Sequence, residues 1–220
     1  MKSSLRNMVL SLGGIAVGVA ALLGAVHSLT ARPIAEAAAA QAREAVAEVL
    51  PPFDNDPMAA AVDIDGCEVY PATMQGAPAG AAVRVTTMDG FSGRIVVMAG
   101  FDAGGTLTGY RVLEQAETPG LGAQADEWFR TAPHTVLGTS SELIVSKDAA
   151  PAAAGDAHSG AGPQQDAGDD AHSGASPRHS APATETVDGI TAATITSRAF
   201  LGAVNRARRA YQQYQESCKR

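Results

Sequence analysis

The sequence contains two adjacent runs of β-branched residues, Val83-Arg84-Val85-Thr86-Thr87 and Ile95-Val96-Val97-Met98. A third run, 106–113, alternates side chains of different polarity, as half-buried strands do. Turn signals separate the runs at Asp89-Gly90, Gly93 and 103–105. Because runs joined by short turns pair with their neighbours, we predict an antiparallel meander between residues 62 and 113.

Helical patterns flank this sheet. Residues 32–50 are Ala-rich and stop at Pro51-Pro52, which predicts a helical stalk. Residues 197–216 carry apolar side chains at helical spacing, which predicts a helix covering the sheet. Its apolar face comprises Phe200, Leu201, Val204, Ala207, Tyr211 and Tyr214. With a short helical piece at 126–130 and a strand at 142–146, the predicted class is α+β.

The N-terminal part has the pattern of a membrane anchor. Lys2 and Arg6 precede an uncharged apolar run over 8–26, close to the length that crosses a bilayer. We predict a cytoplasmic tail at 1–7, a transmembrane helix at 8–29 and the stalk at 30–52, with the rest outside the cytoplasm. The alternative is a signal peptide cleaved near Leu29-Thr30-Ala31, but the long run favours a retained anchor.

Residues 149–186 differ in composition from everything around them. They are mostly Ala, Gly, Ser, Pro, Asp and His, and the hexapeptide at 156–161 recurs at 170–175. Such a segment buries too little surface to offset its ordering entropy, so we predict a disordered insertion within one domain spanning 53–216, before a tail at 217–220. Its sparse histidines, His158, His172 and His179, favour a solvated spacer, and we predict no metal site.

Charge and cysteine content narrow the functional classes. The net charge of −7 argues against nucleic acid as a partner. Cys67 and Cys218 lack the spacing of a zinc or iron–sulfur motif, and whether they form a disulfide stays open. No arrangement of nucleophile and base is evident, so we expect no independent catalysis.

The stretch Asp188-Gly189-Ile190-Thr191-Ala192-Ala193-Thr194-Ile195-Thr196-Ser197 combines small and hydroxyl residues just before a helix. Small residues let the backbone approach a ligand, and helix N-termini attract phosphate. Thr196 or Ser197 is expected to cap the helix. The residues alone fit either a phosphate-contacting turn or an ordinary capped helix start.

This stretch resembles the flavinylation motif of FMN-binding domains in the G subunit of the Rnf electron transport complex. Asp188, Thr191, Ala193 and Thr194 match the motif, and so do residues 196–198 after it, whereas Ala192 replaces the usual Gly. The resemblance implies that the Thr194 hydroxyl carries FMN through a phosphoester.

A second stretch, Glu117-Thr118-Pro119-Gly120-Leu121-Gly122, resembles a loop that lies against the flavin in the same family, and Trp128-Phe129 follow as expected. Pro119 stiffens such a loop, and its glycines allow close approach to a flat ring. The cofactor-binding residues implied by the two stretches are Thr194, Asp188, Thr191, Ala192, Ala193, Thr196, Glu117, Thr118, Gly120, Leu121 and Gly122.

The resemblance implies an electron-carrier subunit of an ion-translocating oxidoreductase, anchored in the bacterial inner membrane with its domain on the periplasmic side. Covalent FMN would pass electrons between redox subunits, coupled to cation transport. The implied partners are the other integral membrane and redox subunits and an FAD-dependent flavin transferase. The alternatives are the similar C subunit of the sodium-translocating NADH:quinone reductase, another flavinylated respiratory carrier, or a membrane-tethered interaction module without flavin.

Overall fold

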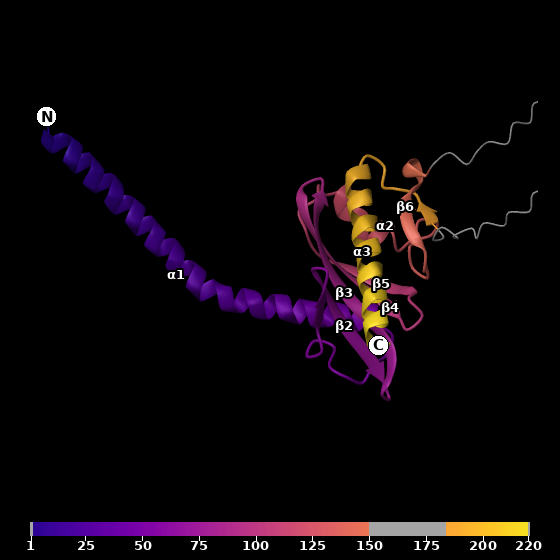
Figure 1. Cartoon of the computed structure of the whole chain (residues 1–220). Coiled ribbons are helices and arrows are strands. Elements are labelled where there is room, and N and C mark those ends of the chain that lie inside the picture. Colours follow the sequence, from indigo (N-terminus) through magenta and orange to yellow (C-terminus); the bar gives the residue numbers. More distant parts are fainter. Residues whose placement is uncertain (1, 150–183, 220) are drawn as a thin grey trace, which may run out of the picture.

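A computed structural model of the chain describes residues 2–149 and 184–219. Its centre is a five-stranded sheet in the order β1-β2-β3-β4-β5, with every neighbouring pair antiparallel (Figure 1). The strands are β1 (Val62–Ile64), β2 (Cys67–Met74), β3 (Ala77–Gly90), β4 (Gly93–Asp102) and β5 (Leu107–Gln115). The predicted meander is therefore confirmed.

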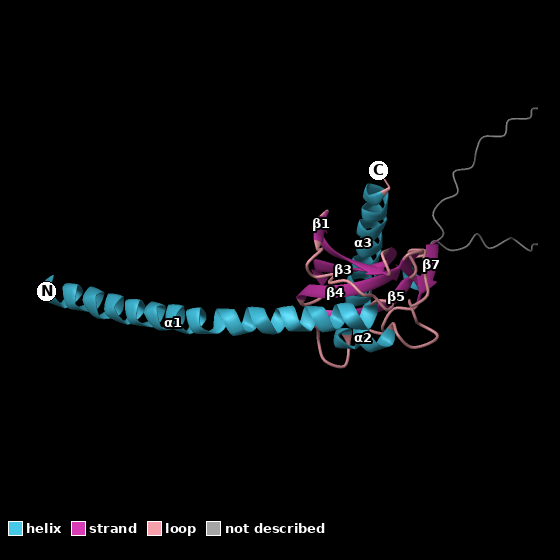
Figure 2. Ribbon diagram, turned by 90° about the horizontal axis from the view of Figure 1, so that it is seen from below, coloured by secondary structure: helices cyan, strands magenta, loops and turns pink. Residues whose placement is uncertain are grey.

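The sheet is covered on both faces, by helix α3 (Thr194–Cys218) on one and by the end of helix α1 (Lys2–Val49) on the other (Figure 2). Because side chains alternate along a strand, successive residues face opposite helices. Val83 and Val85 face the α3 side, whereas Ala82 and Met98 face the α1 side. Both faces are apolar where the helices cover them.

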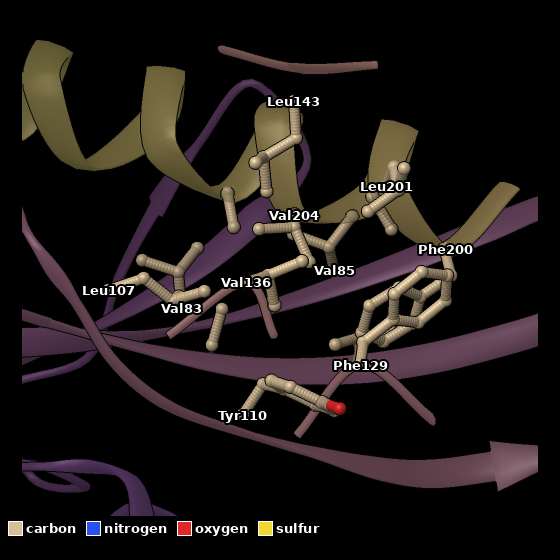
Figure 3. Packing of buried hydrophobic residues seen from close by; sticks show 14 of the residues in the cluster. Val83, Val85, Leu107, Tyr110, Phe129, Val136, Leu143, Phe200, Leu201 and Val204 are labelled. Carbon is tan, nitrogen blue, oxygen red and sulfur yellow. The ribbon is translucent and has the colours of Figure 1, made fainter. Parts of the chain in front are cut away.

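The larger core lies between the sheet and α3 (Figure 3). Phe129 and Phe200 stack with ring centroids 4.9 Å apart, and Tyr110 meets Phe200 edge-on at 4.9 Å. The Tyr110 hydroxyl donates to the Asp126 carbonyl at 2.8 Å. These contacts fix the short helix α2 (Ala125–Trp128), and with it the loop that precedes α2, against the sheet.

Helix α1 runs without interruption through the predicted anchor and stalk and ends before Pro51. Its first part exposes large apolar side chains, and this helix is long and apolar enough to cross a membrane. It bends along its length (Figure 1), and Pro33, which lacks a backbone donor, lies inside it. Its last turns are buried on the sheet, so the end of the stalk is also part of the core.

A small second sheet pairs β6 (Glu142–Val145) with β7 (Thr184–Val187) in parallel. Residues 184–186, predicted to belong to the insertion, are thus in a strand whose last residue, Val187, is buried in the core. The other residues of the predicted insertion, 150–183 with His158, His172 and His179, lie outside the described part of the chain. Two 3-10 helices, η1 (Gly122–Gln124) and η2 (Ser146–Asp148), complete the architecture.

The two cysteines do not form a disulfide. Cys67 is buried at the start of β2, whereas Cys218 is exposed at the end of α3. Burial raises the pKa of the Cys67 thiol, although the nearby Arg206 opposes that shift. The thiol of Cys67 therefore behaves as a small apolar core side chain.

Candidate functional site

The two motif stretches meet at one cavity of about 280 Å³, where the N-terminus of α3 approaches the 117–122 loop. The tip of the β3–β4 hairpin supplies the third wall. The lining residues are Phe91, Glu117, Thr118, Leu121, Gly122, Ala192, Ala193, Thr194, Ile195 and Thr196. Segments about eighty residues apart in sequence thus form a single site.

Glu117 joins the three walls. Its carboxylate accepts a hydrogen bond from the Thr196 hydroxyl at 2.7 Å and another from the Ser92 backbone N–H at 3.0 Å. Only 7% of the residue is exposed. A buried carboxylate is tolerated when donors satisfy its oxygens, so these bonds hold the helix, the loop and the hairpin tip together.

Two glycines make room for this carboxylate. A Cβ on Gly122 would lie 2.6 Å from Thr196 Oγ1 and 2.7 Å from Glu117 Oε2. A Cβ on Gly90 would lie 2.6 Å from Glu117 Oε1. All three distances are too short for a real side chain, so the buried Glu117–Thr196 pair depends on the two glycines.

The turn before α3 is held by Ser197. Its hydroxyl accepts from the Ile190 N–H at 2.9 Å and donates to the Ala193 carbonyl at 3.0 Å. The expectation that Thr196 or Ser197 caps the helix is wrong, because both residues lie inside the helix. The helix begins three residues before the predicted start, at Thr194, with Ala193 as its N-cap.

No side chain caps this helix start. The first backbone N–H groups of an α-helix lack intrahelical acceptors, and they carry the positive end of the helix dipole. Thr194, the first helical residue, is half-buried and lines the cavity. A phosphate at the Thr194 hydroxyl would therefore fit the chemistry of this end of the cavity.

Ala192 is in the left-handed region, with φ of 64°. A Cβ is unfavourable there, which is the physical reason for glycine at such a position. The departure of this residue from the motif therefore has a structural consequence. The turn has the backbone conformation suited to glycine, and the chain forms it with alanine.

Three of the predicted residues, Gly120, Asp188 and Thr191, are not among those lining the cavity. Asp188 faces away, where its carboxylate accepts from the Ser146 hydroxyl at 2.7 Å and its carbonyl accepts from Trp128 Nε1 at 3.1 Å. His134, stacked on Trp128 with centroids 4.3 Å apart, has Nδ1 3.9 Å from Asp188 Oδ2. Asp188 therefore holds the turn before α3 in place through its hydrogen bonds to Ser146 and Trp128.

Sequence reasoning missed two residues of the cavity, Phe91 and Ile195. They are 68% and 51% exposed, and with Leu121, 39% exposed, they form an apolar rim. Ile195 lies inside the quoted motif and was overlooked because the motif is defined by its small and hydroxyl residues. Phe91 could have been found from the sequence, because an aromatic residue at a hairpin tip, where polar residues are usual, indicates a contact surface.

The chain is thus a long apolar helix followed by an α+β domain, in which an uncapped helix start and the 117–122 loop line one cavity. The FMN-binding domain family matches residues 90–209, and the RnfG N-terminal region matches residues 1–49. The chain belongs to the FMN-binding domain family, among its Rnf-type G subunits.

Similar proteins include three that are each named as the G subunit of an ion-translocating oxidoreductase complex. The one from Escherichia coli (strain K12) is 30% identical over 94% of this chain and 91% of its own length. The one from Aliivibrio fischeri (strain MJ11) is 28% identical over 98% of this chain and 94% of its own. The one from Yersinia pestis is 34% identical over 57% of this chain, and the match spans 65% of that protein's length.

Proposed function

We propose that this chain is the flavin-bearing electron carrier of a membrane-bound, ion-translocating oxidoreductase, with FMN joined through its phosphate to Thr194 Oγ1. The observation that carries the proposal is the shared cavity. The half-buried Thr194 starts an uncapped helix and lines the same cavity as the 117–122 loop. This combination offers a hydroxyl for esterification, N–H groups for a phosphate and an apolar surface for a ring.

The size of the cavity supports a binding mode in which the cavity holds the phosphate end of FMN and the ring lies outside it. Its volume of about 280 Å³ is at the low end for sites that enclose a small molecule. FMN is larger than such a space, so the apolar rim of Phe91, Leu121 and Ile195 is the surface available to the rest of the cofactor. A ring held at this exposed rim would suit a carrier, because electrons must pass between the cofactor and other subunits.

Bound FMN supplies the redox chemistry, accepting and releasing electrons, and the protein supplies position and surroundings. Glu117 and Thr196 hold the loop against the helix. The α3 N-terminus stabilises negative charge on the phosphate. No residue of this chain needs to act as acid or base in the carrier role.

Attachment follows a balanced phosphoryl transfer. An FAD-dependent transferase would break the pyrophosphate of FAD, join the FMN phosphorus to Thr194 Oγ1 and release AMP, while the hydroxyl loses its proton. A covalent bond has a clear benefit outside the cytoplasm. Where free flavin is scarce, mass action would empty a reversible site.

The proposed location is the bacterial inner membrane, with α1 as a single-pass anchor and the domain on the periplasmic side. The exposed apolar part of α1 and the basic residues before it support this orientation. The partners would be the other integral membrane and redox subunits of the complex. Cations would then cross the membrane through other subunits of the complex, because the apolar span of this chain carries no carboxylate that could form an ion path.

The test is coexpression of the full chain with a flavin transferase, followed by denaturation. The wild type should retain yellow fluorescence and gain the mass of one FMN less one water. Thr194→Val keeps the shape but removes the hydroxyl, so it should lack both signals. Thr194→Ser is the matched control and should keep them. A colourless wild type would favour a tethered module without flavin, and a fluorescent Thr194→Val would refute the assigned residue.

A further inference from the structure

A second cavity, of about 410 Å³, lies beside the middle of α3, next to the start of β6. Ser140 and Ser141 line it on one side, and Arg208, Arg209 and Gln212 of α3 line it on the other. Arg208 is fourteen residues along the helix from Thr194, which corresponds to about 21 Å at 1.5 Å per residue. The cavity is therefore separate from the FMN site.

Arg208 is almost completely buried there, with 4% of its surface exposed. Its Nη2 donates to the carbonyl and the hydroxyl of Thr139, at 3.2 Å and 3.1 Å. Its Nε and Nη1 are buried without any hydrogen-bond partner in the described structure. A guanidinium has five N–H donors and stays charged. Arg208 Cζ lies 6.0 Å from the centre of the Phe101 ring, a cation–π contact that leaves the Nε and Nη1 donors without an acceptor.

The surroundings do not supply the missing acceptor. No carboxylate among residues 2–149 and 184–219 forms an ion pair with Arg208. Burial lowers the pKa of Arg208, and the more distant Glu185 and Glu142 only partly oppose that shift. The Asn205 side chain is already committed, since its Oδ1 accepts from the Leu143 N–H and its Nδ2 donates to the Leu143 carbonyl.

The rest of the lining is rich in donors. The hydroxyls of Ser140 and Ser141, the amide of Gln212 and the guanidinium of Arg209 surround the buried Arg208, and all four residues reach the surface at least in part. Glu142 is the one acidic residue in this lining, and it is exposed. Guanidinium groups pair best with carboxylate and phosphate oxygens.

We propose that this cavity is a binding site for a small solute bearing an oxyanion, a phosphate or a carboxylate, which accepts hydrogen bonds from Arg208. Neither Nε nor Nη1 reaches the surface of the cavity in this structure, so the guanidinium would turn toward the anion on binding. The anion would then satisfy these donors and balance a charge that pairs with no carboxylate among the described residues. The site is independent of the flavin because it shares no lining residue with the FMN cavity.

The experiment measures phosphate binding to the full chain in detergent micelles. Inorganic phosphate is titrated against chloride at equal ionic strength, with thermal unfolding and calorimetry as readouts. We expect phosphate to raise the melting temperature of the wild type beyond the effect of chloride. Arg208→Gln should weaken the apparent phosphate affinity about tenfold or more, since it removes hydrogen bonds to a charged group.

Control variants show whether phosphate binds at this cavity and not elsewhere on the chain. Arg206→Gln removes a charge from the same helix, where Arg206 donates to the Thr86 carbonyl at 2.7 Å outside the cavity, and should bind phosphate normally. If Arg208→Gln fails to fold, Ser141→Ala serves instead and should weaken binding a few-fold.

Thr194→Val should respond like the wild type, which separates this site from the flavin. No phosphate effect beyond chloride, an unchanged affinity in the variants of the cavity, or loss of the effect in Thr194→Val would each overturn the proposal.

Discussion

Two pairs of glycines bring the backbone close to a neighbour, and the neighbours differ. Gly100 and Gly109, paired across β4 and β5, meet Val49 at the end of α1. Gly90 and Gly122 meet the carboxylate of Glu117. In the first pair the missing side chains let the apolar helix dock on the sheet. In the second pair they leave room for a buried charged group beside the cavity, so the same residue type serves stability in one place and the site in the other.

Substitution of Gly100, which lies against the end of α1, should give the largest loss of stability. A Cβ on Gly100 would lie 2.1 Å from the Val49 carbonyl oxygen, and a backbone atom cannot rotate away as a side chain can. Gly100→Ala should therefore lower the free energy of unfolding by about 3 kcal/mol, the upper end for overpacking, by pushing α1 off the sheet. Thermal unfolding of the full chain in detergent measures this loss.

The control for that variant is Gly202→Ala. Gly202 lies in α3, and a Cβ there would meet nothing within 4 Å. Because alanine is the better helix former, this change should stabilise the chain by about 0.5–1 kcal/mol. Equal losses in both variants would mean that α1 does not depend on the close approach at Gly100.

The Glu117–Thr196 pair should give an intermediate effect. Thr196→Val removes the donor and leaves a buried carboxylate oxygen unsatisfied, which should cost about 1–3 kcal/mol. Flavin attachment should fall as well, because the loop and the helix start are no longer held together. Unfolding and in-gel flavin fluorescence are measured on the same preparations.

A double-mutant cycle measures how strongly Glu117 and Thr196 are coupled. Thr196→Val and Glu117→Gln should show a coupling energy of about 1 kcal/mol, because the two side chains share one hydrogen bond. Thr191→Val is the matched control, since Thr191 is exposed and does not line the cavity. Additive effects of Thr196→Val and Glu117→Gln would show that the pair does not hold the site together.

The smallest change in stability is expected for a substitution of Ala192, and it should be a gain. Ala192→Gly removes a Cβ from a position with φ of 64°, so it should stabilise the chain by about 1 kcal/mol. Ala103→Gly, in the exposed β4–β5 turn without a positive φ, should instead lose a few tenths of a kcal/mol. A loss at Ala192 as well would mean that the turn tolerates alanine without strain.

Local patterns were sufficient for much of this architecture. The β-branched runs predicted β3 and β4, and the apolar spacing from Phe200 to Tyr211 predicted the buried face of α3. Nine of the ten residues that line the cavity lie in the two motif stretches, 117–122 and 188–197. These features are carried by neighbouring residues, which is why periodicity and spacing reveal them.

Other features depend on contacts between distant segments. The burial of Val46 and Val49 follows from the docking of α1 at Gly100, which an Ala-rich pattern cannot show. The hydrogen bond from the Thr196 hydroxyl to Glu117 joins residues that are 79 positions apart, so local spacing cannot reveal it. The burial of Arg208 depends on its packing against Thr139, which the spacing of residues along the helix does not show.

Mapping the modified residue tests the assignment of FMN to Thr194. Trypsin should release residues 179–198 as one peptide, which contains Thr184, Thr186, Thr191, Thr194 and Thr196. Tandem mass spectrometry of that peptide, from the full chain matured with its transferase, should place one FMN phosphoester on Thr194. A flavin on another residue, or an unmodified peptide from fully matured protein, would contradict the account.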